Sequence, residues 1–320
     1  MAGATGTIMT VTTAAPAIST EGLTRFYGPH PGIVDLDLSV APGEVFGFLG
    51  PNGAGKTTTI RLLLDFIRPT RGRARVLDLD TRADSLAIRR RVGYLPGELR
   101  LYDTLSGREL LGYFGHLRGG VDWSWVNELA ERLDCDLGRE VKVLSHGNRQ
   151  KLGLIQAFMS RPDLLVLDEP TAGLDPLVQQ TFFSLVEEAR ERGATAFVSS
   201  HVLPEVERLC DRVAMIAEGR MLTTERVSDL KRRALRSLEF TFAQPVPEAA
   251  FAGLPGVQEL RVDGSRLRCR VMGSVDGLLK AANRYEVLNV VSQEPSLEEI
   301  FVSLYARARE EREARENDGS

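Results

Sequence analysis

The segment from Gly50 to Thr58 has the residues and the spacing of a phosphate-binding loop. Its sequence, GPNGAGKTT, matches the pattern GxxxxGK[ST] in full. Glycines let the backbone curl so that successive N–H groups point at an anion, Lys56 reaches the β- and γ-phosphates, and the Thr57 hydroxyl is suited to ligate Mg²⁺. The pattern therefore indicates a nucleoside triphosphate as the ligand. Its candidate contacts are Gly50, Pro51, Asn52, Gly53, Ala54, Gly55, Lys56, Thr57 and Thr58.

Two adjacent carboxylates follow an apolar run further along the chain, in the sequence LLVLDE that ends at Glu169. We expect Asp168 to hold Mg²⁺ together with Thr57, and Glu169 to act as the general base or to orient the attacking water. Two acids after an apolar run often only mark the point where a strand meets solvent. The phosphate-binding loop upstream favours the functional interpretation.

These groups require strands and helices that place them at one edge of a sheet. Residues 45–49 predict a buried strand before the loop, and residues 58–64 predict a helix after it. Further short apolar runs at 164–167, 195–199 and 213–216 alternate with helical patterns. This alternation is typical of a largely parallel sheet with helices on both faces.

Two further regions differ from this alternation. Between Leu99 and Val143 the apolar residues recur at helical spacing without strands, which predicts a helical insertion. After about Lys231 the pattern predicts a strand at 238–242, a hairpin around Asp263-Gly264, a helix at 275–282, a strand at 287–291 and a last helix. That last helix begins with Ser296-Leu297-Glu298-Glu299, which has the spacing of a capping box.

The segment Leu144-Ser145-His146-Gly147-Asn148-Arg149-Gln150, followed by a helical pattern, identifies a family resemblance. It resembles the LSGGQ signature of the ATP-binding subunits of ABC transporters, with His146 and Asn148 departing from that pattern. It also lies about twenty residues before the two acids, as in that family. The resemblance implies that Ser145 and Gly147 contact ATP bound by a second subunit, because a helix N-terminus suits a γ-phosphate.

Three other positions match the same family. Asp175, in AGLDP, resembles the residue of the loop that passes between the two nucleotide sites and contributes in trans. His201 resembles the switch histidine that contacts the γ-phosphate, and Tyr27 resembles the aromatic residue that stacks on adenine. Without the family resemblance, His201 reads as an ordinary hydrogen-bonded histidine at the end of a strand. The alternative for Tyr27 is an aromatic residue of the core, although Phe26 is the better candidate for that role.

One family position is different. Where the family carries a Gln that senses Mg²⁺, the chain reads Tyr94-Leu95-Pro96-Gly97-Glu98-Leu99, with Gly97 at the position of the Gln. Glu98 either replaces it as a metal ligand, or the metal contact is absent.

The composition limits the alternatives. The 320 residues carry 40 Lys and Arg against 44 Asp and Glu, a net charge of −4, so nucleic acid is not an expected partner. Three distant cysteines suggest neither disulfides nor a zinc site. No apolar run has the ~20 residues of a membrane-spanning helix. The resemblance implies a location at the cytoplasmic face of the cell membrane, with attachment through a membrane subunit.

Together these features predict an α/β fold: a P-loop ATPase domain with a mostly parallel sheet and a helical insertion, plus a small C-terminal α+β domain. The expected divisions are a flexible leader at 1–19, the ATPase domain at 20–230 with its insertion at about 99–160, the small domain at 231–306 and a charged tail at 307–320.

The resemblance implies a subunit that binds and hydrolyses ATP with Mg²⁺, pairs with a second ATPase subunit head to tail, and powers a separate transmembrane subunit. The end of the chain, from Glu294 to Phe301, is similar to the extension found in drug, antibiotic and sodium exporters. We therefore expect export of drugs, antibiotics or other hydrophobic compounds. The alternative is a soluble ABC ATPase that acts on the ribosome or on DNA.

Overall fold

The computed structural model describes residues 15–233, 236–293, 297–298, 300–302 and 305–306. The tail at 307–320, most of the predicted leader and two residues of the predicted capping box, Ser296 and Glu299, lie outside these residues. The chain divides into two compact units. The first contains residues 1–46, 52–199 and 218–220, and the second contains residues 47–51, 200–217 and 221–320.

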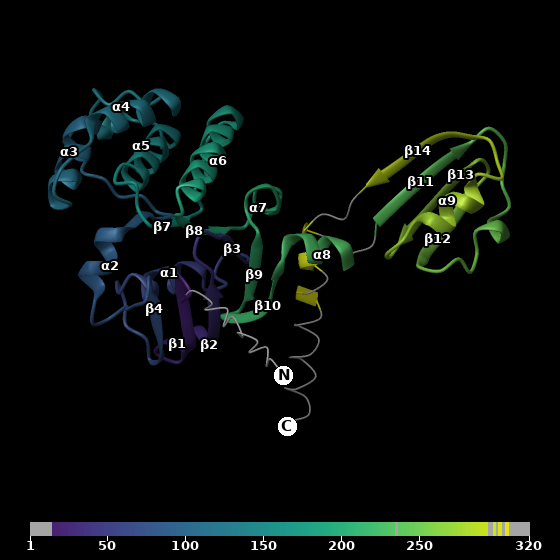
Figure 1. Ribbon diagram of the computed structural model, residues 1–320, viewed down its shortest axis with the longest axis horizontal. Helices are drawn as coiled ribbons and strands as arrows, with labels where there is room; N and C mark the ends of the chain where they lie inside the picture. The colour runs from purple at the N-terminus through teal and green to yellow at the C-terminus, as the bar shows by residue number, and fades with distance from the viewer. Residues whose placement is uncertain (1–14, 234–235, 294–296, 299, 303–304, 307–320) are drawn as a thin grey trace, which may run out of the picture. The chain divides into compact units, whose positions relative to one another are not determined.

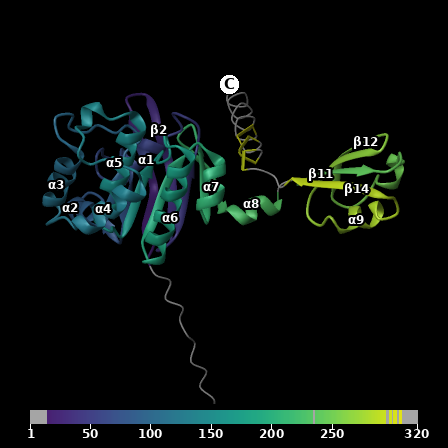
Figure 2. The same ribbon diagram turned by 90° about the horizontal axis from the view of Figure 1, so that it is seen from above.

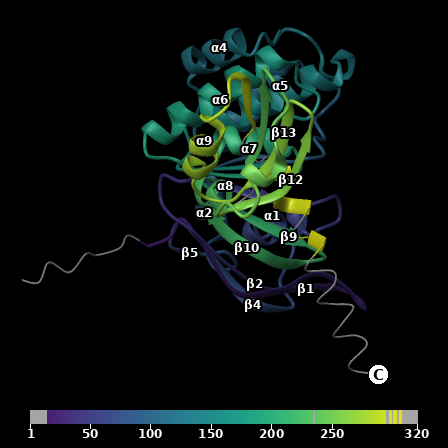
Figure 3. The same cartoon turned by 90° about the vertical axis from the view of Figure 1, so that its right-hand side faces the viewer.

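The first unit contains an antiparallel sheet that the sequence analysis did not predict (Figure 3). Its strand order is β2-β1-β4-β5, and the strands are β1 (Ile18–Tyr27), β2 (His30–Val40), β4 (Arg71–Val76) and β5 (Leu79–Asp80). Along β2 the residues from Val34 to Val40 alternate between buried and exposed. One face of this strand therefore packs on the core, and the other meets solvent.

A second sheet has six strands in the order β10-β9-β3-β8-β7-β6. The strands are β3 (Val45–Leu49), β6 (Val92–Leu95), β7 (Leu164–Asp168), β8 (Thr195–Ser200), β9 (Arg212–Ala217) and β10 (Arg220–Arg226). β6, β7 and β8 pair in parallel. Every residue of β3, β7 and β8 is buried, which explains the apolar sequences of β3 and of β7 up to Asp168. The strands predicted from the short apolar runs are confirmed.

The helices of the first unit include the predicted insertion. They are α1 (Lys56–Leu63), α2 (Ser85–Arg91), α3 (Gly107–Leu117), α4 (Trp123–Arg132), η1 (Val141–Val143), α5 (His146–Phe158) and α6 (Pro176–Glu191). Figure 1 shows α3, α4 and α5 grouped together. Ser106 and Glu109 form a capping box at the start of α3, and Leu110, Val126 and Leu129 are buried. The helical character of this region is confirmed.

The second unit contains α7 (Leu203–Leu209), α8 (Val227–Arg233) and the elements that follow. A four-stranded antiparallel sheet has the order β12-β13-β11-β14. These elements are β11 (Arg236–Phe242), η2 (Glu248–Ala250), β12 (Val257–Asp263), β13 (Arg266–Val271), α9 (Asp276–Ala282) and β14 (Val287–Gln293). Phe240, Phe242, Phe251 and Leu278 of α9 share a buried core, so α9 covers one face of this sheet (Figures 1 and 2). The predicted hairpin, helix and strands are confirmed, whereas the domain boundary near residue 230 stays a prediction.

The described residues bear on the cysteines and on membrane-spanning helices. Cys135, Cys210 and Cys269 are buried and take part in no disulfide. In the described part of the chain, no helix is both long and apolar enough to cross a membrane.

Candidate functional site

The predicted phosphate loop connects β3 to α1, as its motif requires. Gly53 has φ +80° and Gly55 has φ +111°, in the left-handed region that favours glycine. A Cβ at Gly53 would meet nothing within 4 Å, so the backbone conformation, and not crowding, explains the glycine there. Among the described residues no side chain caps α1, and its first turn holds no acidic residue. The helix N-terminus is therefore suited to bind an anion.

The Lys56 side chain lies at this N-terminus and is nearly buried. Its Nζ is 3.3 Å from Oε1 of Glu169, and the two side chains are 7% and 20% exposed. The ion pair brings together the phosphate-binding lysine and the candidate base that the sequence analysis named.

Asp168 is the last residue of β7 and is buried. The Thr57 hydroxyl donates a hydrogen bond of 2.9 Å to its Oδ2, and the Ser199 hydroxyl donates one to its Oδ1. Thr57 and Asp168, the two predicted metal ligands, therefore lie side by side. The sequence analysis missed Ser199, although its position two residues before His201, at the end of a predicted strand parallel to β7, is a signal that could have found it.

Glu169 follows the last residue of β7 and has φ +51°, an uncommon conformation for a residue with a side chain. Its N–H donates to the carbonyl of Ser199 at 3.1 Å. Glu169 therefore lies in the turn beyond the strand, and the conformation of this turn positions its carboxylate. Left-handed residues of this kind concentrate at functional sites, where the surroundings hold them.

The signature-like segment lies against the loop that contains Asp175. Ser145 is the N-cap of α5, and its Oγ accepts a hydrogen bond of 3.3 Å from the N–H of Asn148. A Cβ on Gly147 would come within 2.7 Å of the Gly173 carbonyl oxygen, and a Cβ on Gly173 within 2.5 Å of the His146 ring. The close approach explains why glycine occupies both positions.

Asp175 is exposed and is the N-cap of α6. Its Oδ1 accepts hydrogen bonds from the N–H groups of Val178 and Leu177 at 3.0 and 3.1 Å. These hydrogen bonds, chiefly that from Val178, hold the pKa of Asp175 below its ordinary value. The carboxylate therefore has a structural function within its own chain, whatever it does in a dimer.

The altered loop after β6 lies next to Asp168. A Cβ on Gly97 would be 3.2 Å from Oδ2 of Asp168, so a larger residue there requires the carboxylate to shift. The Glu98 side chain is exposed and pairs with Arg100 at 3.0 Å. Burial raises the pKa of Tyr94 to about 12, with the charge of Asp168 as a second cause. Gly97 thus lies beside the Asp168 carboxylate, while Glu98 is engaged at the surface.

The remaining predicted contacts have a less defined geometry. Tyr27 ends β1 with 44% of its surface exposed, and the Arg25 guanidinium carbon lies 4.9 Å from its ring centroid. Phe26 is half-buried. His201 directly follows β8 and is exposed.

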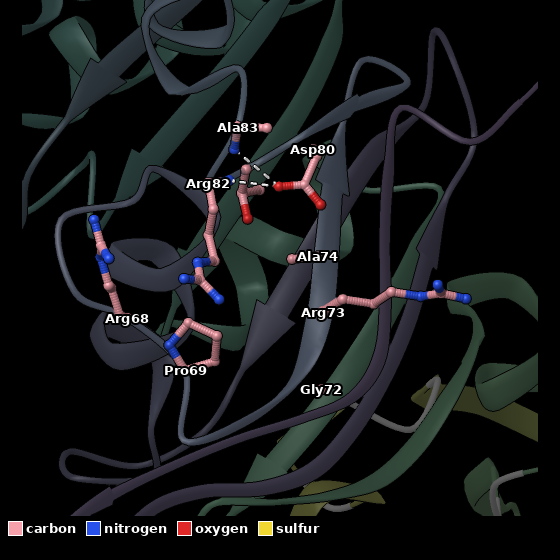
Figure 4. Close-up of a pocket in the computed structure, with 9 residues that line it drawn as sticks. Arg68, Pro69, Gly72, Arg73, Ala74, Asp80, Arg82 and Ala83 are labelled. Carbon is pink, nitrogen blue, oxygen red and sulfur yellow. Dashed lines mark hydrogen bonds between the residues drawn. The ribbon is translucent and has the colours of Figure 1, made fainter.

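A separate pocket of about 400 Å³ lies on the first unit near β4 and β5 (Figure 4). The Asp80 carboxylate accepts hydrogen bonds from the N–H groups of Arg82 and Ala83 at its wall. The pocket shares no residue with the phosphate loop, so it adds nothing to the phosphate chemistry.

Comparisons with known proteins point to one family. A family model described as "ABC transporter" matches residues 33–172. The chain is 35% identical over 295 residues to the bacitracin transport ATP-binding protein of Bacillus licheniformis, covering 90% of this chain and 96% of that protein. It is 33% identical over 322 residues to the daunorubicin/doxorubicin resistance ATP-binding protein of Streptomyces peucetius, covering 94% and 96%.

Solved structures give the same result for the fold. One titled as the ATP-binding subunit of an ABC transporter is 27% identical, with a TM-score of 0.64, covering 68% of this chain and 92% of that one. A dimeric bacterial ABC transporter cassette is 21% identical, with a TM-score of 0.61, covering 66% and 98%. At that identity the second likeness concerns the fold alone.

Proposed function

We propose that this chain, which belongs to the ATP-binding proteins of ABC transporters, powers the export of an antibiotic or another hydrophobic drug through a separate membrane subunit. One observation carries the enzymatic part of the proposal. The start of α1 brings Lys56 to Glu169 and Thr57 to Asp168, so a phosphate-binding lysine, two candidate metal ligands and a candidate base converge at one helix N-terminus.

The side chains at this site fit Mg²⁺. Asp168 and Thr57 offer hard oxygen ligands 2.9 Å apart. These two side chains would hold the ion, and Mg²⁺ is commonly bound by one or two protein oxygens together with phosphate oxygens and water. When bound, the ion neutralises charge on the β- and γ-phosphates.

Each of the chain's own residues then has a defined task. The backbone N–H groups of the phosphate loop and Lys56 bind the β- and γ-phosphates, and Tyr27 stacks on the adenine. Glu169 accepts a proton from water as the water oxygen bonds to the γ-phosphorus and the bond to the β,γ-bridging oxygen breaks. His201 contacts the γ-phosphate. The products are ADP and inorganic phosphate.

A second copy of the chain completes each site in this proposal. Ser145, Gly147 and Asp175 lie at or near the N-termini of α5 and α6, and Ser145 and Asp175 are exposed. In a two-fold dimer, these residues of one chain face the nucleotide held by the phosphate loop of the other. Binding of ATP then favours the closed pair, and hydrolysis favours its opening, which moves the membrane partner.

The export role and the location rest on the relatives. Two relatives that this chain matches over more than nine-tenths of their lengths are named for bacitracin transport and for daunorubicin/doxorubicin resistance. By analogy, we place the chain at the cytoplasmic face of the membrane, held there by its partner.

Drug efflux measured in cells tests this role. The chain is co-expressed with the membrane protein encoded beside it, and cells are loaded with a fluorescent anthracycline or challenged with bacitracin. We expect efflux or resistance that requires both proteins and is lost in Lys56→Ala. Equal efflux with and without the chain, over a panel of drugs, would contradict the export role while leaving the ATPase assignment intact.

A further inference from the structure

The side-chain amide of Gln150 holds the backbone at the start of the turn that carries Glu169. Gln150 is the fifth residue of α5 and is 3% exposed. Its Nε2 donates to the carbonyl oxygen of Glu169 at 3.3 Å and to that of Pro170 at 3.1 Å. An amide nitrogen carries two protons, so one side chain can serve both carbonyls. The nitrogen, and not the oxygen, must face them, because a carbonyl oxygen only accepts.

The other end of the same turn also contacts α5. The His146 ring and Gly147 lie so close to Gly173 that neither glycine has room for a side chain. α5 therefore contacts the segment 169–173 at both ends, through Gln150 at its start and through residues 146–147 at its end. A displacement of α5 must be transmitted to this segment.

The conformation of Glu169 needs such support. Its φ of +51° is disfavoured for a residue with a side chain. Its N–H donates to Ser199, and its carbonyl accepts from the N–H of Ala172 at 3.2 Å as well as from Gln150. The Gln150 side chain therefore connects α5 directly to the backbone of Glu169.

We propose that Gln150 is a positioning residue for the Glu169 carboxylate and that it links the two nucleotide sites of the dimer. This inference rests on the proposed function, in which Ser145 at the start of α5 contacts the nucleotide of the partner chain. Gln150 then ties the base of one site to the helix that senses the other. Hydrolysis in one site is fastest when α5 is held by the nucleotide of the opposite site.

The first experiment measures steady-state ATPase activity and ATP affinity of the full-length protein with Mg²⁺. Gln150→Glu keeps the shape of the side chain and replaces its donors by acceptors. We expect kcat to fall roughly 10- to 100-fold, as for a misplaced catalytic group, with the Kd for ATP within about twofold of the unmodified protein. Gln156→Glu makes the same change at a half-buried position on the same helix and should leave kcat unchanged. If Gln150→Glu does not fold, Gln150→Met removes the donors without adding charge.

A double-mutant cycle separates positioning from a merely structural role. In a Glu169→Gln background the carboxylate that Gln150 aligns is gone, so the second substitution should lower the residual single-turnover rate less than about twofold. Loss of the same factor in both backgrounds would show that Gln150 only stabilises the fold, and would overturn the inference.

The experiments distinguish a failure of the proposed function from a failure of the positioning role of Gln150. Normal turnover in Glu169→Gln alone contradicts the proposed function. Slow turnover in Glu169→Gln together with normal turnover in both Gln150 variants contradicts only the positioning role. A link between sites also predicts that Ser145→Ala and Gln150→Met together cost less than the product of their separate effects on kcat, whereas the full product would contradict the link.

Discussion

Lys56 and Glu169 form an ion pair, with Nζ 3.3 Å from Oε1, at the N-terminus of α1. The same amine is the proposed contact for the β- and γ-phosphates, and the same carboxylate is the proposed base. We therefore expect ATP and Glu169 to compete for Lys56, with nucleotide binding releasing the carboxylate toward water.

This competition predicts separate effects on stability and on binding. Lys56→Met leaves the largely buried Glu169 carboxylate without the lysine, and we expect a loss of on the order of 2 kcal/mol, less than at a fully buried pair because Glu169 keeps some exposure. Adding Glu169→Gln should restore most of this loss, because the amide needs no cation. Thermal unfolding and ATP titration check this: both variants should bind ATP poorly. Recovery of ATP binding in the double variant would show that Lys56 is not a phosphate ligand.

Asp175 offers a way to separate capping from a function in the dimer. Its side chain caps α6, and Asn is about as good an N-cap as Asp, whereas Ala is not. We expect Asp175→Asn to keep the thermal stability that Asp175→Ala loses. If the charge acts across the dimer, both variants lower kcat. Full ATPase activity in Asp175→Asn would show that Asp175 acts only as the N-cap of α6.

The Gly97-Glu98 loop predicts a variant that uncouples transport. Because Glu98 is exposed and paired with Arg100, we expect Glu98→Ala to keep basal ATPase within about twofold and to lower transport by the reconstituted complex. Arg100→Ala is the matched control for loss of the pair alone. A fall in both activities, with a higher Mg²⁺ requirement, would instead indicate a metal ligand. No change in either would reduce the loop to a turn.

The C-terminal region is predicted to be dispensable for nucleotide binding. Deletion after Leu230 removes Lys231, which pairs with Glu207 at 3.0 Å, and Leu297, whose N–H donates to the same carboxylate. We expect lower thermal stability but an ATP Kd within about threefold of the full-length value, because the phosphate loop, Asp168 and Glu169 all lie before this point. A folded truncated chain that fails to bind ATP would show that the predicted boundary is misplaced.

Local patterns predicted the elements that are buried on both faces. β3, and β7 up to Asp168, have apolar sequences because every residue in them is buried, and such runs are visible without any structure. The antiparallel sheet was missed, although the alternation of Val34, Leu36, Leu38 and Val40 in β2 is the pattern of a half-exposed strand.

The site residues likewise fall into those that a sequence motif predicts and those that were missed. Lys56, Thr57, Asp168 and Glu169 belong to motifs whose spacing names their chemistry. Gln150 was missed because its backbone partners lie 19 and 20 residues away along the chain, and only the packing of α5 brings them together. The signal for Ser199, its position two residues before His201, was present in the sequence but was not used. No local sequence signal predicts the positive φ of Glu169, because glycine is the residue that usually adopts this backbone conformation and the chain has a glutamate here.

ATP turnover by Glu169→Gln, measured together with the molar mass of the Mg-ATP-bound species, is the decisive measurement. We expect turnover to fall about 10²- to 10⁴-fold, because the base is lost, while ATP binding is kept. The variant should then accumulate as an ATP-bound dimer in light scattering, because hydrolysis no longer opens the pair. Near-normal turnover, or a monomer at saturating Mg-ATP, would contradict the assignment of Glu169 as the base of a composite ATP site.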